Sequence, residues 1–255
     1  MYKIDYMNIR DLIILDIETV PAQPSFTHLS AEWKALFTEK ASKIVPFQGE
    51  MEDLYKKRAG IWAEFGKIVC IVAGVFSMEE TGKELLHLVS FDAKEEVQIL
   101  RDFSLFCEKS YSVRPGLRLA GHNIREFDIP FIGRRMLING LPLPQAFQIQ
   151  DKKPWELMQL DTLQFWKWGD YKNYVSLHLL ASVLQIPSSK TGITGSQVQD
   201  VYYREGNLGA IVDYCRQDVV ATTRVIQKLH QLPPIEDEQI KILEFRPETM
   251  FTTLW

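Results

Sequence analysis

The chain has 255 residues, of which 46% are hydrophobic and 24% are charged, and its formal net charge at pH 7 is −4. This length and apolar content predict a single globular domain, residues 1–255, with a sizeable core. The slightly acidic balance excludes a globally basic nucleic-acid-binding protein. It does not exclude an enzyme that contacts nucleic acid through a local patch or through metal ions.

The cysteine content and the lack of long apolar runs predict a cytoplasmic protein. Cys70, Cys107 and Cys215 are far apart and do not have the spacing of metal ligands, so we expect reduced thiols. The first residues lack the apolar segment of a signal peptide, and no run is long enough to cross a membrane. We therefore expect no membrane partner.

The order of hydrophobic patterns predicts an α/β fold. Strands are expected at 12–17, 66–77, 83–91 and 116–123, with a short fifth strand within 157–165. Helical periodicity is expected at 92–109, 127–140, 176–186 and 208–230. Three strands thus precede an alternation of strand and helix, which indicates a mixed five-stranded sheet flanked by helices.

Two segments do not fit this alternation. Residues 22–66 are rich in aromatic and charged side chains, and we expect a helical insertion between the first and second strands. Its aromatic residues either pack on the domain or cover a cleft as a lid. Residues 233–255 are interrupted by proline and are expected to form a tail along the surface.

Acidic residues occur in three of the predicted elements. In "LDIET", Asp16 and Glu18 leave the same face of a buried strand, which is costly unless the strand end is solvated or a cation lies between them. In "GHNIREFD", Asp128 follows a strand and begins a helix, where alone it would be a helix N-cap. In "DYCRQD", Tyr214 and Asp218 are four residues apart and share one helix face.

Together the three motifs resemble those of the DEDD superfamily of 3′–5′ exonucleases, the DnaQ-like enzymes with a ribonuclease H-like fold. The first motif of that family is D-x-E-[TS], matched by Asp16, Glu18 and Thr19. The second is N-x₃-[FY]-D, matched by Asn123, Phe127 and Asp128. The third is Y-x₃-D or H-x₄-D; Tyr214 and Asp218 fit the first form, and Asp213 occupies the position of the histidine, which indicates the DEDDy branch.

The second and third motifs most resemble those of the proofreading exonuclease domain of family B DNA polymerases and of stand-alone predicted PolB-like exonucleases. The resemblance implies a metal-dependent 3′–5′ exonuclease that acts in DNA repair on the 3′ end of single-stranded DNA and releases nucleoside 5′-monophosphates. It also implies two divalent cations, Mg²⁺ or Mn²⁺, about 3.5–4 Å apart. Two alternatives stay open: an RNA 3′-end-processing exonuclease of the same chemistry, and a non-catalytic nucleic-acid-binding module.

The resemblance also implies roles for individual residues. The metal ligands would be Asp16, Glu18, Asp128 and Asp218, with Asp16 bridging both ions. Tyr214 would orient, or help deprotonate, the attacking water; orientation is favoured because a phenol with a pKa near ~10 is a poor base at neutral pH.

Candidate substrate-binding residues are Thr19, Asn123, Phe127 and Lys190, although each also has a purely structural interpretation. Asp161 is a candidate supporting acid. Five arginines within 114–135 form a possible backbone-binding patch.

Overall fold

The sheet observed in the computed structural model, which describes residues 8–44, 49–153, 156–187 and 192–254, has six strands rather than the predicted five. Their order across the sheet is β5-β4-β1-β2-β3-β6. The strands are β1 (Leu12–Pro21), β2 (Gly66–Met78), β3 (Glu84–Asp92), β4 (Arg118–Gly121), β5 (Leu160–Asp161) and β6 (Ile240–Leu243). The sheet is mixed, because β1, β2 and β3 pair antiparallel whereas β4, β5 and β6 join by parallel pairing.

The sixth strand comes from the segment that was expected to be a surface tail. Ile240–Leu243 pairs in parallel with Leu86–Val89 of β3 and extends the sheet at that edge. The prediction was wrong here because a four-residue strand between prolines has too little pattern of its own, and its pairing is set by β3.

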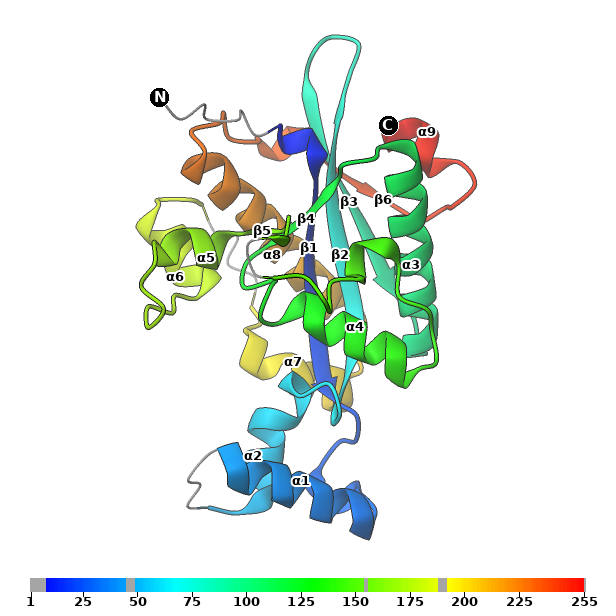
Figure 1. Ribbon diagram of the computed structural model, residues 1–255, viewed down its shortest axis with the longest axis vertical. Helices are drawn as coiled ribbons and strands as arrows, with labels where there is room; N and C mark the ends of the chain where they lie inside the picture. Colours follow the sequence, from blue (N-terminus) through cyan, green and yellow to red (C-terminus); the bar gives the residue numbers. More distant parts are fainter. Residues whose placement is uncertain (1–7, 45–48, 154–155, 188–191, 255) are drawn as a thin grey trace.

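Helices cover both faces of the sheet, and α1 (Ala31–Ile44) and α2 (Met51–Arg58) lie beyond one end of it (Figure 1). The others are α3 (Glu96–Val113), α4 (Asp128–Ile138), α5 (Thr162–Lys167), α6 (Leu177–Val183), α7 (Val198–Asp200), α8 (Leu208–Leu229) and α9 (Met250–Leu254). A π-helical turn, Val201–Glu205, joins α7 to the loop before α8. No helix in the described part of the chain is long and apolar enough to cross a membrane.

Two apolar cores sandwich the sheet, and the alternation of side chains along β1 supplies both. Ile13, Leu15 and Ile17 pack in the core under α3 and α4, whereas Leu12 and Ile14 pack in the core under α8. Asp16 and Glu18 continue the second series, so they point to the α8 side. This two-layered arrangement of helices on a mixed sheet is the ribonuclease H-like fold that the motifs predicted.

Residues 22–66 form the predicted helical insertion, which lies beyond the Pro21 end of β1 (Figure 1). Its aromatic residues build a separate small core: the rings of Phe37 and Tyr55 are 5.1 Å apart, and those of Phe37 and Phe65 are also 5.1 Å apart. All three rings are buried. Packing therefore accounts for these aromatic residues, as one of the two interpretations predicted.

One irregularity of the sheet creates the space for a site. β4 pairs with β1 only from Leu12 to Ile14 and then ends at Gly121. From Leu15 onward, β1 therefore has no strand beside it on the β4 side. The loop 122–127 and the start of α4, which follow β4 in the chain, lie along this edge instead. Asp16 and Glu18 lie next to this open edge.

Candidate active site

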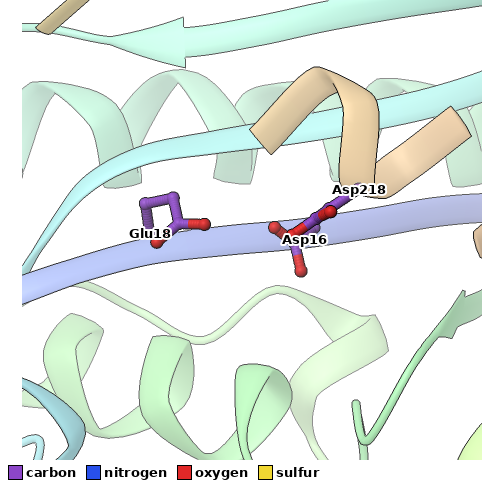
Figure 2. Close-up of side chains that lie close together, drawn as sticks. All are labelled: Asp16, Glu18 and Asp218. Atoms are coloured by element: carbon purple, nitrogen blue, oxygen red, sulfur yellow. The ribbon is translucent and has the colours of Figure 1, made fainter. Parts of the chain in front are cut away.

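Three carboxylates predicted to be metal ligands meet on the α8 face of the sheet. Each of Asp16, Glu18 and Asp218 offers an oxygen, and these oxygens lie within 4.8 Å of one another (Figure 2). Asp218 reaches β1 because α8 packs directly over β1 and β2, with Cys215 and Val219 buried on the same helix face. Segments from opposite ends of the sequence thus supply one acidic cluster.

Asp128 approaches the cluster from the open edge of β1. Its side chain is 3% exposed, and its Oδ1 accepts a hydrogen bond of 3.2 Å from the backbone N–H of Ile17. The position before it, Phe127, is the N-cap of α4, so Asp128 does not have the N-cap role that its position alone suggested. The short β4 leaves the N–H of Ile17 without a strand partner, and the carboxylate takes that place.

Burial raises the pKa values of all four acids, and repulsion within the cluster raises those of Asp16 and Glu18 further. The pKa values of Asp16 and Glu18 lie well above their usual range, first because of burial and then because of neighbouring groups that include Asp128 and Asp218. Burial raises the pKa of Asp128 to about 7, against the lowering effect of its backbone hydrogen bonds. Burial likewise raises the pKa of Asp218 to about 6, although Tyr214 and His178 oppose it.

No lysine or arginine among the described residues pairs with this cluster, although His178 lies close enough to lower the pKa of Asp218. The ion pairs identified within the described part of the chain all use other acids. Asp128 is buried and the other three carboxylates are partly buried, so without a paired lysine or arginine among the described residues they are costly in the ionised state, which is the arrangement expected where a cation binds.

Tyr214 lies one helical turn before Asp218, and its hydroxyl hydrogen-bonds to that carboxylate. Burial and the surrounding carboxylates raise the pKa of its phenol, so the hydroxyl stays protonated at neutral pH. Gly195 lies beside this hydroxyl: a Cβ atom added at Gly195 would be 4.0 Å from the hydroxyl oxygen. Tyr214 can therefore donate a hydrogen bond, but it cannot accept a proton as a base.

A cavity of about 410 Å³ opens beside these two residues, between α6, the loop 193–195 and α8. Tyr214 and Asp218 form part of its wall, and His178 of α6 forms another part. His178 was missed by the sequence analysis, because a single histidine on an amphipathic helix has no distinctive pattern.

Cys215 was also missed, although it lies inside the third motif. Its Sγ donates to the backbone oxygen of Asp16 at 3.4 Å and to Asp16 Oδ2 at 3.3 Å. The thiol thereby holds the orientation of the central carboxylate. The contact joins residues 199 positions apart, so no local sequence signal exists for it.

The predicted substrate-binding residues have different surroundings. Asn123 adopts a left-handed conformation with φ 62°, and its buried Oδ1 has no hydrogen-bond partner. Phe127 packs against Phe131, with ring centroids 5.5 Å apart, and Thr19 is half-buried on β1. Lys190 lies outside the described residues. Among the three described residues, Asn123 therefore has an unsatisfied polar atom. Substrate binding by any of the four residues stays a prediction.

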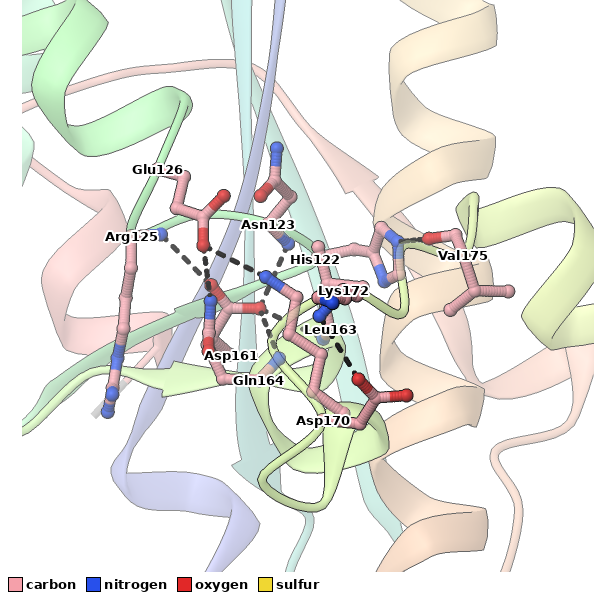
Figure 3. Close-up of polar contacts among 11 residues, drawn as sticks. His122, Asn123, Arg125, Glu126, Asp161, Leu163, Gln164, Asp170, Lys172 and Val175 are labelled. Atoms are coloured by element: carbon pink, nitrogen blue, oxygen red, sulfur yellow. Dashed lines mark hydrogen bonds and ion pairs between the residues drawn. The ribbon is translucent and has the colours of Figure 1, made fainter.

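Asp161, a candidate supporting acid, organises the loop that carries Asn123 (Figure 3). One of its oxygens accepts from the backbone N–H of Asn123 at 3.0 Å, and the other accepts from that of Arg125 at 3.0 Å. It also caps α5 by accepting from Leu163 N. Asp161 thus fixes the loop between β4 and α4, and this loop fixes Asp128.

The arginines within 114–135 do not form one exposed patch. Arg135 is buried and pairs with Glu96, whereas Arg114 pairs with Asp11. Arg125 donates to the backbone oxygen of Gln159. These partners show that three of the five arginines hold the fold together, which the sequence did not reveal because their partners are distant.

Comparisons with known proteins agree with this geometry. A protein-family model described as "Predicted 3′–5′ exonuclease related to the exonuclease domain of PolB" matches residues 62–233. The match contains Asp128, Tyr214 and Asp218. It begins after β1, so Asp16 and Glu18 lie outside the match, and the fold brings them next to Asp218. Comparison with curated proteins gives no match.

Among solved structures, the chain is similar to the family B DNA polymerase of the hyperthermophilic archaeon Pyrobaculum calidifontis. The TM-score is 0.53 at 15% sequence identity, over 85% of this chain and 24% of the polymerase chain. The similarity supports the fold, and the chain corresponds to about a quarter of that polymerase.

Proposed function

The chain belongs to the family of predicted 3′–5′ exonucleases related to the exonuclease domain of PolB, and we propose from this premise that it is a metal-dependent 3′–5′ exonuclease of the DEDDy type. Its substrate would be the 3′ end of single-stranded DNA, as in DNA repair, and its products nucleoside 5′-monophosphates. The observation that carries the proposal is the convergence of Asp16, Glu18 and Asp218 within 4.8 Å.

The donor set fits divalent cations. Carboxylate oxygens are hard ligands that suit Mg²⁺ or Mn²⁺, and the cluster offers them without a paired lysine or arginine among the described residues. We assign Asp16, Glu18 and Asp218 to one ion and Asp16 with Asp128 to a second. Such ions neutralise the developing charge on the phosphate and lower the pKa of a bound water.

The side chains around the cluster have distinct tasks in this proposal. Tyr214 stays protonated, and its hydroxyl positions the attacking water. The same hydroxyl donates a hydrogen bond to Asp218. Cys215 fixes the orientation of Asp16. The Oδ1 of Asn123, which has no hydrogen-bond partner, would accept a hydrogen bond from the terminal nucleotide.

We also propose that residues 1–255 act as one exonuclease domain in the cytoplasm. The sheet supports this proposal because it takes β1 from the beginning of the sequence and β6 from its end. The three cysteines are free and buried, which suits a reducing compartment.

The test uses 5′-labelled single-stranded DNA and RNA of identical sequence with Mn²⁺. We expect a ladder that shortens from the 3′ end of the DNA, and no ladder with Asp16→Asn. Asp213→Asn is a matched control, because this acid is exposed on α8, pairs with Arg216 and should leave hydrolysis unchanged. Faster shortening of RNA would indicate the RNA-processing alternative, and binding without hydrolysis would indicate the non-catalytic module.

A further inference from the structure

The last turn of α5 and the segment that joins it to α6 expose an unusual group of aromatic side chains. We name residues 165–174 the aromatic loop. Within it, Trp168 is 85% exposed, Tyr171 is 86% exposed, Tyr174 is 64% exposed and Phe165 is 38% exposed. Large aromatic side chains normally bury most of their area, so four exposed rings in ten residues require an explanation beyond the stability of the free chain.

The backbone of the aromatic loop is strained where it presents its most bulky ring. Trp168 ends α5 in the left-handed conformation, with φ 49° and ψ 30°, and Gly169 follows with φ 89°. Glycine or asparagine adopts this conformation with less strain than a tryptophan. The Trp168 ring makes an edge contact with Phe165, their centroids 5.9 Å apart, but most of its area stays exposed. Strained residues of this kind occur preferentially at functional sites.

The aromatic loop is tied to the acidic site by hydrogen bonds. His122, which precedes Asn123, bonds through Nε2 to the backbone oxygen of Val175 at 2.9 Å (Figure 3). Its Nδ1 bonds to Thr162 Oγ1 at 2.8 Å. Val175 directly follows the loop and is buried. The loop is therefore anchored at the open edge of β1.

The residues that follow Val175 in the chain lead to the cavity of the active site. Ser176 caps α6 immediately after Val175, and His178 of this helix lines the cavity together with Tyr214 and Asp218. The aromatic loop is thus joined through Val175 and Ser176 directly to the helix that lines the cavity.

We propose that the aromatic loop is a stacking platform for the unpaired bases upstream of the 3′ end. Flat aromatic faces bind bases of any sequence by stacking, and Lys172, exposed between Tyr171 and Tyr174, supplies a cation for a phosphate. The charge of Asp170 is turned into the loop, where its carboxylate accepts from the backbone N–H of Lys172 at 3.1 Å. The inference rests on the proposed function and adds a second contact region to it.

A protein partner is the competing explanation for exposed aromatic residues, and two features favour nucleic acid. The rings alternate with polar residues, Lys172 and Asn173 among them, rather than forming a continuous aliphatic surface. The platform is also bonded to the β4–α4 loop that carries Asn123, because Lys167 of the platform donates to Glu126 of that loop at 3.0 Å, whereas a partner-binding surface has no need of this connection.

The test measures binding separately from hydrolysis. Full-length protein carrying Asp16→Asn is titrated against 5′-fluorescein (dT)₁₂, (rU)₁₂ and a 12-base-pair duplex, with anisotropy as the readout. In this background, Trp168→Ala and Tyr171→Ala should each weaken binding of both single strands by about 5- to 100-fold. Binding of the duplex should change little, because its internal bases are paired. Trp33→Ala is the matched control, since Trp33 is a 43% exposed ring on α1 of the insertion.

Trp168→Gly separates a binding role from a structural one. Glycine removes the ring and relaxes the left-handed backbone, so the melting temperature should rise or stay constant while the affinity for single strands falls. Tyr171→Phe should keep most of the affinity and Tyr171→Leu should lose it, because only the former retains a flat ring. Unchanged affinity in Trp168→Ala and Tyr171→Ala would overturn the inference, and so would a change in oligomeric state without a change in affinity.

The outcome is distinguishable from failure of the proposed function. If the unmodified chain hydrolyses a 3′ end but the aromatic variants bind (dT)₁₂ as tightly as their parent, the exonuclease proposal is supported and the stacking platform is refuted. If the unmodified chain hydrolyses nothing with Mg²⁺ or Mn²⁺ but the variants bind single strands more weakly, the stacking platform is supported and the exonuclease proposal is refuted. In the active protein, the loss of kcat/KM in Trp168→Ala should be larger for a 12-nucleotide substrate than for a dinucleotide.

Discussion

Replacing Asp128 with asparagine in the metal-free protein should raise the free energy of unfolding at pH 8. The side chain is 3% exposed, and burial raises its pKa from 3.8 to about 7. At about 1.4 kcal/mol per pKa unit, this shift means that ionised Asp128 costs the folded state on the order of 4 kcal/mol. Asparagine removes the charge, and its side-chain oxygen still accepts from the N–H of Ile17.

The sign of the pH dependence follows from the same shift. The folded-state pKa lies above the unfolded value, so the cost is absent near pH 4, grows as the pH rises and is complete above about pH 7. The advantage of Asp128→Asn should therefore shrink to less than half between pH 8 and pH 5. For a chain of this size, the difference at pH 8 corresponds to a melting temperature raised by roughly 5–15 °C.

The assay is urea unfolding in EDTA at both pH values, followed by circular dichroism. Asp151→Asn is the control, because Asp151 is exposed and its replacement should change stability by less than about 0.5 kcal/mol. A destabilised Asp128→Asn at pH 8, or an advantage that does not depend on pH, would show that burial of this carboxylate is not costly and would refute the reasoning.

Further predictions concern the cation, the reaction and the fold. Mg²⁺ or Mn²⁺ should raise the melting temperature of the unmodified protein at pH 8 but raise that of Asp218→Asn much less, and excess EDTA should abolish hydrolysis; full activity in EDTA would contradict the metal assignment. A 5′-labelled strand ending in a 3′-phosphate should resist shortening relative to a 3′-hydroxyl end, whereas cuts in a closed circular strand would indicate an endonuclease. Tyr214→Phe should bind (dT)₁₂ normally but lower kcat by about 10- to 1000-fold, since it removes one positioning hydroxyl; kcat within twofold of the unmodified protein would exclude that role. Phe37→Ala should lower the free energy of unfolding by about 3–5 kcal/mol in thermal or urea denaturation, because the ring is fully buried; a loss below ~1 kcal/mol would mean that the insertion unfolds independently.

Local pattern was sufficient to predict most of the sheet and three acidic motifs. The alternation in β1 identifies Asp16 and Glu18 as members of the α8-facing series, and the four-residue spacing on α8 places Tyr214 and Asp218 together. These inferences depend on periods of two and 3.6 residues, which a single segment carries within itself.

The rest depends on partners that are distant in the sequence. Asp128 has the pattern of an N-cap, and only the end of β4 at Gly121 shows why its carboxylate meets Ile17. Arg135 has the composition of a basic patch until Glu96 is placed beside it. β6 was missed for the same reason, since an edge strand of four residues is specified by the strand with which it pairs.

The wide separation of the cluster in the sequence has a consequence for folding. Asp16 and the segment around Cys215 are 199 residues apart, and Ile17 and Asp128 are 111 residues apart. Contacts of such high sequence separation form late, because the entropy of closing the intervening loops must be paid first. A chain in which α8 has not yet docked onto β1 therefore contains all the acids but no cluster. Hydrolytic capacity would then appear only at the last step of folding, so incompletely folded chains during synthesis would leave nucleic acid intact.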